Sequence, residues 1–204
     1  MASVHKHRPA RTVEGEFPQA VRQNEGVTFA SPTDDEAAPD LFRVCFVCSG
    51  NICRSPMAEV VFRDLAAKAG IGHRIASSSA GTGDWHVGEP ADHRTVEALQ
   101  RRGYDGATHR ARQFDPDWFD QLDLVIALDR SHRRILDHWA ATPEDQSKIA
   151  FLMDFAPHHG DNLDVPDPYY SDDAMFDAVL DQVEQACAGL VHQLEPALKH
   201  DPRR

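Results

Sequence analysis

The segment CSGNICRSP at residues 48–56 holds the side chains best suited to chemistry in this sequence. Five residues separate a cysteine, Cys48, from an arginine, Arg54. Gly50 allows the backbone between them to bend inward, so that successive amide groups can point at one centre. An anion at that centre would also meet the planar guanidinium of Arg54 and the positive end of a following helix. The spacing therefore predicts a phosphate-binding loop that contains a nucleophile.

The same positive surroundings favour the thiolate of Cys48, which is the nucleophilic form of cysteine. We expect the sulfur to attack phosphorus in line, while the loop amides and Arg54 stabilise the equatorial oxygens of the transition state. The departing oxygen then needs a proton. Another part of the chain must therefore supply a carboxylic acid.

The segment VPDPYY contains the best candidate for that acid, Asp167. A proline on each side restricts the backbone and holds the carboxyl group in a defined place. The rings of Tyr169 and Tyr170 could form the wall of a slot for a flat aryl group. Taken alone, Asp167 is equally compatible with a simple turn between prolines.

Strand and helix patterns alternate around these motifs. Short apolar runs predict strands near residues 42–47, 122–128 and 149–153, and the repeat of the pattern predicts a further strand near residues 74–79. Helical patterns follow at 55–70, 91–102, 131–140 and 172–198, with glycine as the stop of the first at Gly70. This alternation indicates βαβ units and a parallel sheet, and it places Cys48 and Arg54 in the loop between the first strand and the first helix. Ligands bind at that edge of an open α/β sheet.

The ends of two helices carry specific predictions. Ser55 is expected to cap the first helix, with Pro56 as its first helical residue. Ser171 is expected to cap the last helix, and Pro196 is expected to kink or end it.

Composition limits the domains and the partners. The length of 204 residues suits one well-packed domain plus tails. Residues 1–40 are polar and keep no apolar period, which predicts a disordered or loosely attached extension before a domain at 41–200 and a tail at 201–204. The net charge of −12 argues against nucleic acid or an anionic membrane as a partner. With neither a long apolar stretch nor a signal peptide, the sequence favours a cytoplasmic protein.

The four cysteines suggest thiol chemistry in a reducing compartment rather than a disulfide scaffold. Cys45 and Cys48 form a C-x-x-C pair, but Cys45 falls inside a predicted strand, which favours a buried thiol over a redox partner. Cys187 is expected to be a small core residue. No metal site is predicted, because four candidate histidines have no cysteine or carboxylate partners at metal-site spacing: His5, His7, His158 and His159.

Residues 48–56, the segment GTGDWHVGEPADHR and the DPYY around Asp167 together resemble the low-molecular-weight protein tyrosine phosphatases. The resemblance runs from about Phe42 to the C-terminal helix, in the family's order and spacing. It implies a flavodoxin-like, open, four-stranded parallel sheet with helices on both faces, and a phosphotyrosine-containing protein as partner without metal or organic cofactor. It also implies Cys48 as nucleophile in a phosphocysteine mechanism, Arg54 as phosphate ligand and Asp167 as general acid and then base.

The resemblance also implies further roles. It implies that Cys53 can close a reversible disulfide with the nucleophile and that Ser55 donates to the thiolate. It places Trp85 at the pocket mouth, although a packing role at a loop is also compatible with that residue. The remaining predicted contacts to the substrate or supports of the loop are Ser49, Gly50, Asn51, Ile52, Ser79, His109, Tyr169 and Tyr170. Among them, Asn51 would fix the shape of the loop within a hydrogen-bond network completed by Ser79 and His109. Tyr169 and Tyr170 are also candidate targets of a tyrosine kinase.

Three rival functions use the same features. Arsenate reduction needs further relay cysteines, and the chain has none between Cys53 and Cys187. For a phosphoarginine phosphatase, the resemblance implies threonine at the position of Ile52, so Ile52 favours phosphotyrosine. A phosphoprotein-binding module without catalysis is disfavoured by the complete set of nucleophile, arginine and acid.

Overall fold

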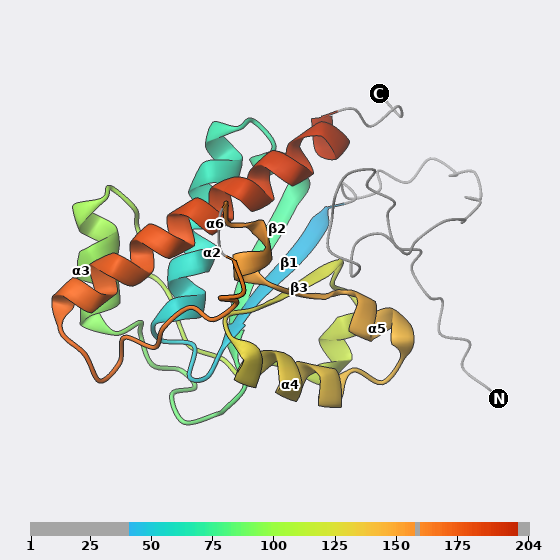
Figure 1. The fold of residues 1–204 in the computed structure, drawn as a ribbon, viewed down its shortest axis with the longest axis horizontal. Coiled ribbons are helices and arrows are strands. Elements are labelled where there is room, and N and C mark those ends of the chain that lie inside the picture. Colours follow the sequence, from blue (N-terminus) through green and yellow to red (C-terminus); the bar gives the residue numbers. More distant parts are fainter. Residues whose placement is uncertain (1–40, 158–159, 200–204) are drawn as a thin grey trace.

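A four-stranded sheet forms the centre of the protein (Figure 1). The structure is a computed structural model that describes residues 41–157 and 160–199. All neighbouring strands are parallel, and their order is β2-β1-β3-β4. The strands are β1 (Phe42–Cys48), β2 (Ile75–Gly81), β3 (Leu124–Ala127) and β4 (Ile149–Phe151). The predicted open, four-stranded parallel sheet is confirmed.

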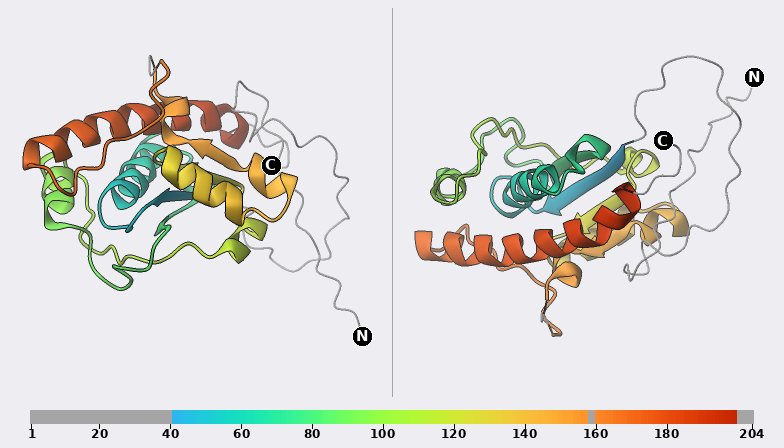
Figure 2. Two further views of the ribbon diagram at one scale, coloured as in Figure 1. Left: turned by 60° about the horizontal axis from the view of Figure 1, so that its bottom comes forward. Right: turned by 90° about the horizontal axis from the view of Figure 1, so that it is seen from above.

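Helices cover both faces of this sheet, as predicted (Figure 2). Alternate side chains of a strand point to opposite faces. Phe46 of β1 therefore joins the larger apolar cluster, which also contains residues of α2 (Arg54–Lys68) and α6 (Asp173–Lys199). Helix α3 (His93–Arg101) packs against α6 and α2. Val47 joins a second cluster, which includes α4 (Arg130–Trp139). A short helix, α5 (Pro143–Ser147), leads from α4 into β4 and was not predicted.

The long helix α6 is anchored by a buried apolar stripe. Phe176 begins the stripe, and Val183, Leu190 and Leu198 continue it along the face that packs against α2. Each such side chain contributes roughly 1.5–3 kcal/mol when it leaves water. The start of α6, and the segment that leads into it, are therefore held firmly against the rest of the domain.

The order of the strands determines where a ligand can bind. From β1 the chain passes to β2 on one side, whereas from β3 it passes to β4 on the other side. Such a switch point opens a crevice beyond the carboxyl ends of the two central strands. Cys48 ends β1 and Asp129 follows β3, so both residues reach this edge.

Two predictions about helix caps were wrong, and of the two effects predicted for Pro196, a kink or an end of the helix, the end is excluded. Helix α2 begins at Arg54 without a side-chain cap, because the Ser55 hydroxyl bonds to groups of the loop and to β2 instead. At α6, Asp172 rather than Ser171 accepts the hydrogen bond from the Met175 amide. Helix α6 also continues past Pro196, since the burial of Leu198 stabilises its last turn.

Some predictions concern parts of the chain outside the described residues: the extension at 1–40, the tail at 201–204, and the histidines His5, His7, His158 and His159. Within residues 41–157 and 160–199, no helix is long and apolar enough to cross a membrane. Among the same residues, no group of three or more histidine, cysteine, aspartate or glutamate side chains could hold a metal ion.

Candidate active site

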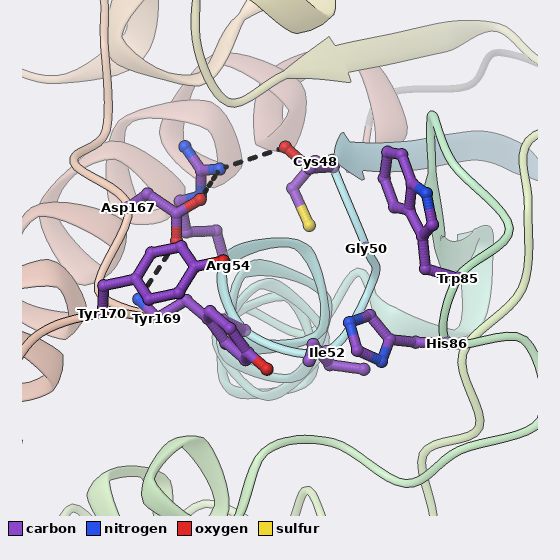
Figure 3. A pocket seen from close by; sticks show the side chains of 11 residues that line it. Cys48, Gly50, Ile52, Arg54, Trp85, His86, Asp167, Tyr169 and Tyr170 are labelled. Atoms are coloured by element: carbon purple, nitrogen blue, oxygen red, sulfur yellow. Dashed lines mark hydrogen bonds and ion pairs between the residues drawn. The ribbon is translucent and has the colours of Figure 1, made fainter.

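A cavity of about 360 Å³ lies at the carboxyl end of β1 (Figure 3). The loop between β1 and α2, hereafter the catalytic loop (residues 48–54), forms its floor. Two distant segments form its walls, one around Trp85 and one around Asp167. The residues that line it are Cys48, Ser49, Gly50, Ile52, Cys53, Arg54, Trp85, His86, Asp167, Tyr169 and Tyr170.

Cys48 is the last residue of β1, and its sulfur faces the cavity. The Sγ atom lies 3.0 Å from the Oγ atom of Ser55. The Ser55 hydroxyl accepts a hydrogen bond from Asn51 Nδ2 (2.8 Å), so its own proton is available for the sulfur or for the carbonyl of Ala80 (3.2 Å). A thiolate is the stronger acceptor, because charged groups form the stronger hydrogen bonds. Ser55 is thus placed to stabilise ionised sulfur.

Asn51 fixes the shape of the catalytic loop. Its φ of 56° is in the left-handed region, which asparagine tolerates better than most residues. The side-chain amide donates to Ser55 and to Ser79 (2.9 Å), and its oxygen accepts from the Arg112 amide (2.9 Å). The main-chain carbonyl of Asn51 accepts from His109 Nε2 (2.7 Å). The structure therefore brings the predicted network together around one residue.

Two features complete this network behind the loop. The Ser79 hydroxyl donates to Glu59 Oε2 (2.6 Å), a contact that sequence reasoning missed. Glu59 lies one helical turn after Ser55, so helical spacing was the available signal. Burial lowers the pKa of His109, which favours the neutral ring that donates from Nε2 to Asn51.

Arg54 is almost completely buried between two carboxylates. Its Nη1 atom donates to Asp129 Oδ2 (2.8 Å) and to the carbonyl of Val165 (3.1 Å). Its Nη2 atom donates to Asp167 Oδ2 (2.7 Å). These two ion pairs fix the direction of the buried guanidinium, although the Asp167 side chain is itself half exposed at the cavity. The candidate general acid is thus held directly beside the candidate phosphate ligand.

A buried histidine connects Asp129 to the catalytic loop. His132 Nε2 lies 2.9 Å from the hydroxyl of Ser49, and Nδ1 lies 3.1 Å from Asp129 Oδ1. Burial lowers the pKa of His132 to about 4, so the ring is neutral at physiological pH. Sequence reasoning missed His132 and did not assign Asp129 to the guanidinium. The available signal was the position of Asp129 directly after the third strand.

The aromatic side chains stand on opposite sides of the cavity mouth (Figure 3). The Tyr169 and Tyr170 rings meet edge to face, with centroids 4.8 Å apart, and Tyr170 is 95% exposed. Trp85 is 68% exposed on the other side, next to His86, which sequence reasoning missed. A flat aryl group that entered between these walls would find apolar surface on both sides.

Gly50 faces His86 so closely that a side chain would not fit. A Cβ atom at Gly50 would lie 2.8 Å from the His86 Cδ2 atom. The φ of Gly50 is not in the left-handed region, so the residue of the loop with the unusual backbone is Asn51, and glycine at position 50 serves to leave room for the His86 ring. The loop residue Ile52 also lines the cavity, and its carbonyl accepts from the Asp92 amide (2.8 Å).

The cysteines differ in their surroundings. Cys53 lines the cavity with Cys48, but burial and then the charge of Asp92 raise its pKa to about 12, so it is a protonated thiol. Cys45 packs in the cluster on the opposite face of the sheet from Cys48, and burial raises its pKa to about 12. The prediction of a buried thiol at Cys45 is confirmed, as is the burial of Cys187 in the core.

Comparisons with known proteins agree with this geometry. The sequence pattern of the family described as low molecular weight phosphotyrosine protein phosphatase matches residues 43–200. A low molecular weight protein-tyrosine-phosphatase of Streptomyces coelicolor is 52% identical over 151 residues, which cover 74% of this chain and 92% of that protein. A low molecular weight protein-tyrosine phosphatase A of Mycobacterium tuberculosis is 42% identical, over 74% of this chain and 90% of that protein. The crystal structure of YfkJ from Bacillus subtilis superimposes with a TM-score of 0.71 at 39% identity, and covers 77% of this chain and 96% of YfkJ. The chain therefore belongs to the low molecular weight phosphotyrosine protein phosphatase family.

Proposed function

We propose that this protein hydrolyses phosphotyrosine in proteins, and small aryl phosphates, through a phosphocysteine formed on Cys48. The observation that carries the proposal is that Cys48, Arg54 and Asp167 meet at one cavity. A nucleophile, a cationic phosphate ligand and a proton donor are what this reaction requires. Membership of the family supports the same activity.

In the first step, the Cys48 thiolate attacks phosphorus and forms a P–S bond while the P–O bond to the tyrosine ring breaks. Asp167 transfers its proton to the departing oxygen, so that a neutral phenol leaves. The loop amides and Arg54 stabilise the charge on the transferred phosphoryl group. The contact between Asp167 Oδ2 and Arg54 Nη2 (2.7 Å) supports this assignment, because it puts the carboxyl group beside the proposed phosphate ligand.

In the second step, water attacks the phosphorus of the phosphocysteine, and the ionised Asp167 accepts a proton from that water. The P–S bond breaks, inorganic phosphate leaves and the thiolate is restored. The Ser55 hydroxyl, 3.0 Å from the sulfur, can donate to the thiolate as the bond breaks.

The lining of the cavity supports an aryl phosphate as the substrate. Trp85 and Tyr169 offer flat apolar surfaces at its mouth, and the apolar side chain of Ile52 also lines the cavity, next to His86 (Figure 3). A guanidino phosphate would need hydrogen-bond acceptors in that position, because its nitrogen atoms carry protons. Ile52 supplies none, which favours phosphotyrosine over phosphoarginine.

A single assay tests the function. The full chain should release inorganic phosphate from phosphotyrosine and para-nitrophenyl phosphate, and vanadate should block both reactions because it mimics the transition state. Excess chelator should leave the rate unchanged, since no step uses a metal. Tight binding of a phosphotyrosine peptide without release of phosphate would contradict the proposal and indicate a binding module.

Oxidation should reveal the role of Cys53. Peroxide would convert the Cys48 thiolate to a sulfenic acid, and the Cys53 thiol would then displace water from that sulfur to form a disulfide. The wild type should therefore lose activity in peroxide and regain it with a thiol reductant. Cys53→Ser should regain much less, because its sulfenic acid is oxidised further.

The control for this experiment is Cys45→Ser, on the opposite face of the sheet, which should recover like the wild type. Recovered activity after reductant is the measurement. Equal recovery of the wild type and Cys53→Ser would show that Cys53 does not protect the nucleophile.

Three finer points belong to the same proposal. The extension at residues 1–40 lies outside the catalytic domain, since the family match begins at residue 43. The protein acts in the cytoplasm, where a reducing environment keeps Cys48 and Cys53 available. A tyrosine kinase could modify Tyr169 or Tyr170, and Tyr170 is the more exposed of the two.

A further inference from the structure

We propose that Arg94 is a positioning residue that holds the segment carrying the general acid against the catalytic loop. The proposal rests on the function proposed above. Arg94 lies in the first turn of α3, and its side chain contacts residues 165–172, hereafter the acid segment. Its Nη1 atom donates to the carbonyl of Ser171 (2.9 Å), and its Nη2 atom donates to the carbonyl of Tyr169 (3.0 Å).

Asp92 fixes the direction of this guanidinium. Its carboxylate accepts from Arg94 Nε (3.0 Å) and from Arg94 Nη2 (2.8 Å), and it also caps α3 by accepting from the Arg94 amide (2.9 Å). The hydrogen bond from the Arg94 side chain holds the pKa of Asp92 below its usual range, so the carboxylate stays ionised. A bidentate pair of this kind sets an orientation as well as a distance.

The pair of Asp92 and Arg94 links the acid segment to the catalytic loop. The main-chain amide of Asp92 donates to the carbonyl of Ile52 in that loop (2.8 Å). A continuous path of hydrogen bonds therefore runs from Ile52 through Asp92 and Arg94 to Tyr169. This path is separate from the two contacts that Arg54 makes with the acid segment, at Asp167 and at the carbonyl of Val165.

Ring contacts restrict Arg94 further. The centre of its guanidinium lies 4.5 Å from the ring centroid of Phe176 and 5.9 Å from that of Tyr169. Phe176 is completely buried at the start of α6. A planar guanidinium can stack on a ring and donate hydrogen bonds at its edge, whereas a lysine ammonium cannot do both.

Tyr169 transmits this restraint to the acid. Its amide donates to Asp167 Oδ1 (3.1 Å), and its carbonyl is the group that Arg94 holds. The main chain of Tyr169, which orients the Asp167 carboxyl group, is therefore held in place by Arg94 of α3. Loss of the two carbonyl contacts should let the acid move relative to the departing oxygen, and a misplacement of about 1 Å can cost up to about 10²-fold in rate.

The test compares two leaving groups in the full chain. Arg94→Met keeps an extended apolar side chain but removes all of the side-chain hydrogen bonds, while the main-chain amide can still donate to Asp92. We expect its kcat to fall about tenfold or more with phosphotyrosine, and less than about threefold with para-nitrophenyl phosphate, which needs little proton donation. Because Arg94 acts through Asp167, adding Arg94→Met to Asp167→Asn should cause almost no further loss.

Arg102→Met is the matched control. Arg102 directly follows the same helix, as its C-cap residue, and pairs with Asp181 and Glu184 of α6 rather than with the acid segment. It should keep the wild-type ratio of the two rates. Thermal unfolding checks that each variant is folded. If Arg94→Met does not fold, Arg94→Lys carries the same comparison, since it retains the charge and should change the ratio in the same direction.

Several outcomes would overturn the proposal. One is that Arg94→Met lowers kcat equally with both substrates. Another is that the loss of kcat in the double variant equals the product of the losses in the two single variants, which would mean that the residues act independently. A third applies if the wild type depends on Asp167 but Arg94→Met keeps the wild-type ratio of the rates with phosphotyrosine and para-nitrophenyl phosphate. That result would contradict the role of Arg94 and leave the role of Asp167 in place. A wild type that hydrolyses neither substrate would instead contradict the proposed function, so the two failures are distinguishable.

Discussion

Replacing Cys48 by serine should abolish turnover while leaving the fold intact. A serine hydroxyl is not ionised near neutral pH, so the site would lose the form of the nucleophile that attacks phosphorus. Removal of a covalent nucleophile typically costs about 10⁴-fold or more in kcat. The exchange of sulfur for oxygen keeps the hydrogen bond with Ser55 available, and it adds no volume to a buried position. The rate of phosphate release is the measurement.

Two comparisons make this result interpretable. Cys45→Ser makes the same substitution three residues earlier, on the opposite face of the sheet, and should retain activity close to that of the wild type. Acid quenching of the wild type during turnover should trap phosphate on Cys48, and mass spectrometry can locate it. A rate for Cys48→Ser within tenfold of the wild type would rule out the covalent mechanism.

Replacing Asp167 by asparagine should damage the reaction in proportion to the need of the leaving group for a proton. The phenol of tyrosine has a pKa of about 10, so its oxygen leaves poorly as an anion, whereas a nitrophenol leaves readily. We expect a loss of about 10²- to 10⁴-fold with phosphotyrosine, and a markedly smaller loss with para-nitrophenyl phosphate. Because the mechanism requires an ionised thiol and a protonated acid, the wild-type rate should be bell-shaped in pH, and the variant should lose the limb at higher pH.

Asp164→Asn is the matched control, three residues earlier in the chain. Asp164 pairs with Arg130 and, unlike Asp167, does not line the cavity. Its variant should keep both rates. If Asp167→Asn lowered the rates with both substrates equally and kept the bell-shaped pH profile, Asp167 would be excluded as the acid. Asp129, the other carboxylate on Arg54, would then be the next candidate.

Most of the fold followed from local patterns. Three of the four strands were marked by a short apolar run, the serine-rich β2 was placed by the repeat of the pattern, and the alternation with helices led to a parallel sheet. The errors were at helix ends, as at Ser55, because a side chain that appears to be a cap can have distant competitors for its hydrogen bonds. The sequence by itself could not show that the Ser55 hydroxyl would bond to Cys48 and Asn51.

The sequence by itself also determined the chemistry of the catalytic loop, because a nucleophile and a phosphate ligand only six positions apart are constrained by the short chain between them. Only the tertiary structure decided which distant groups meet that loop. The partners of Arg54 and of the acid segment come from α3, from the end of β3 and from the chain before α6. Those contacts depend on the order of the strands and on how α3 and α6 pack. Side chains such as Arg94 and His132 therefore carried no local mark of their position, and for Asp129 the position after the third strand was the available signal.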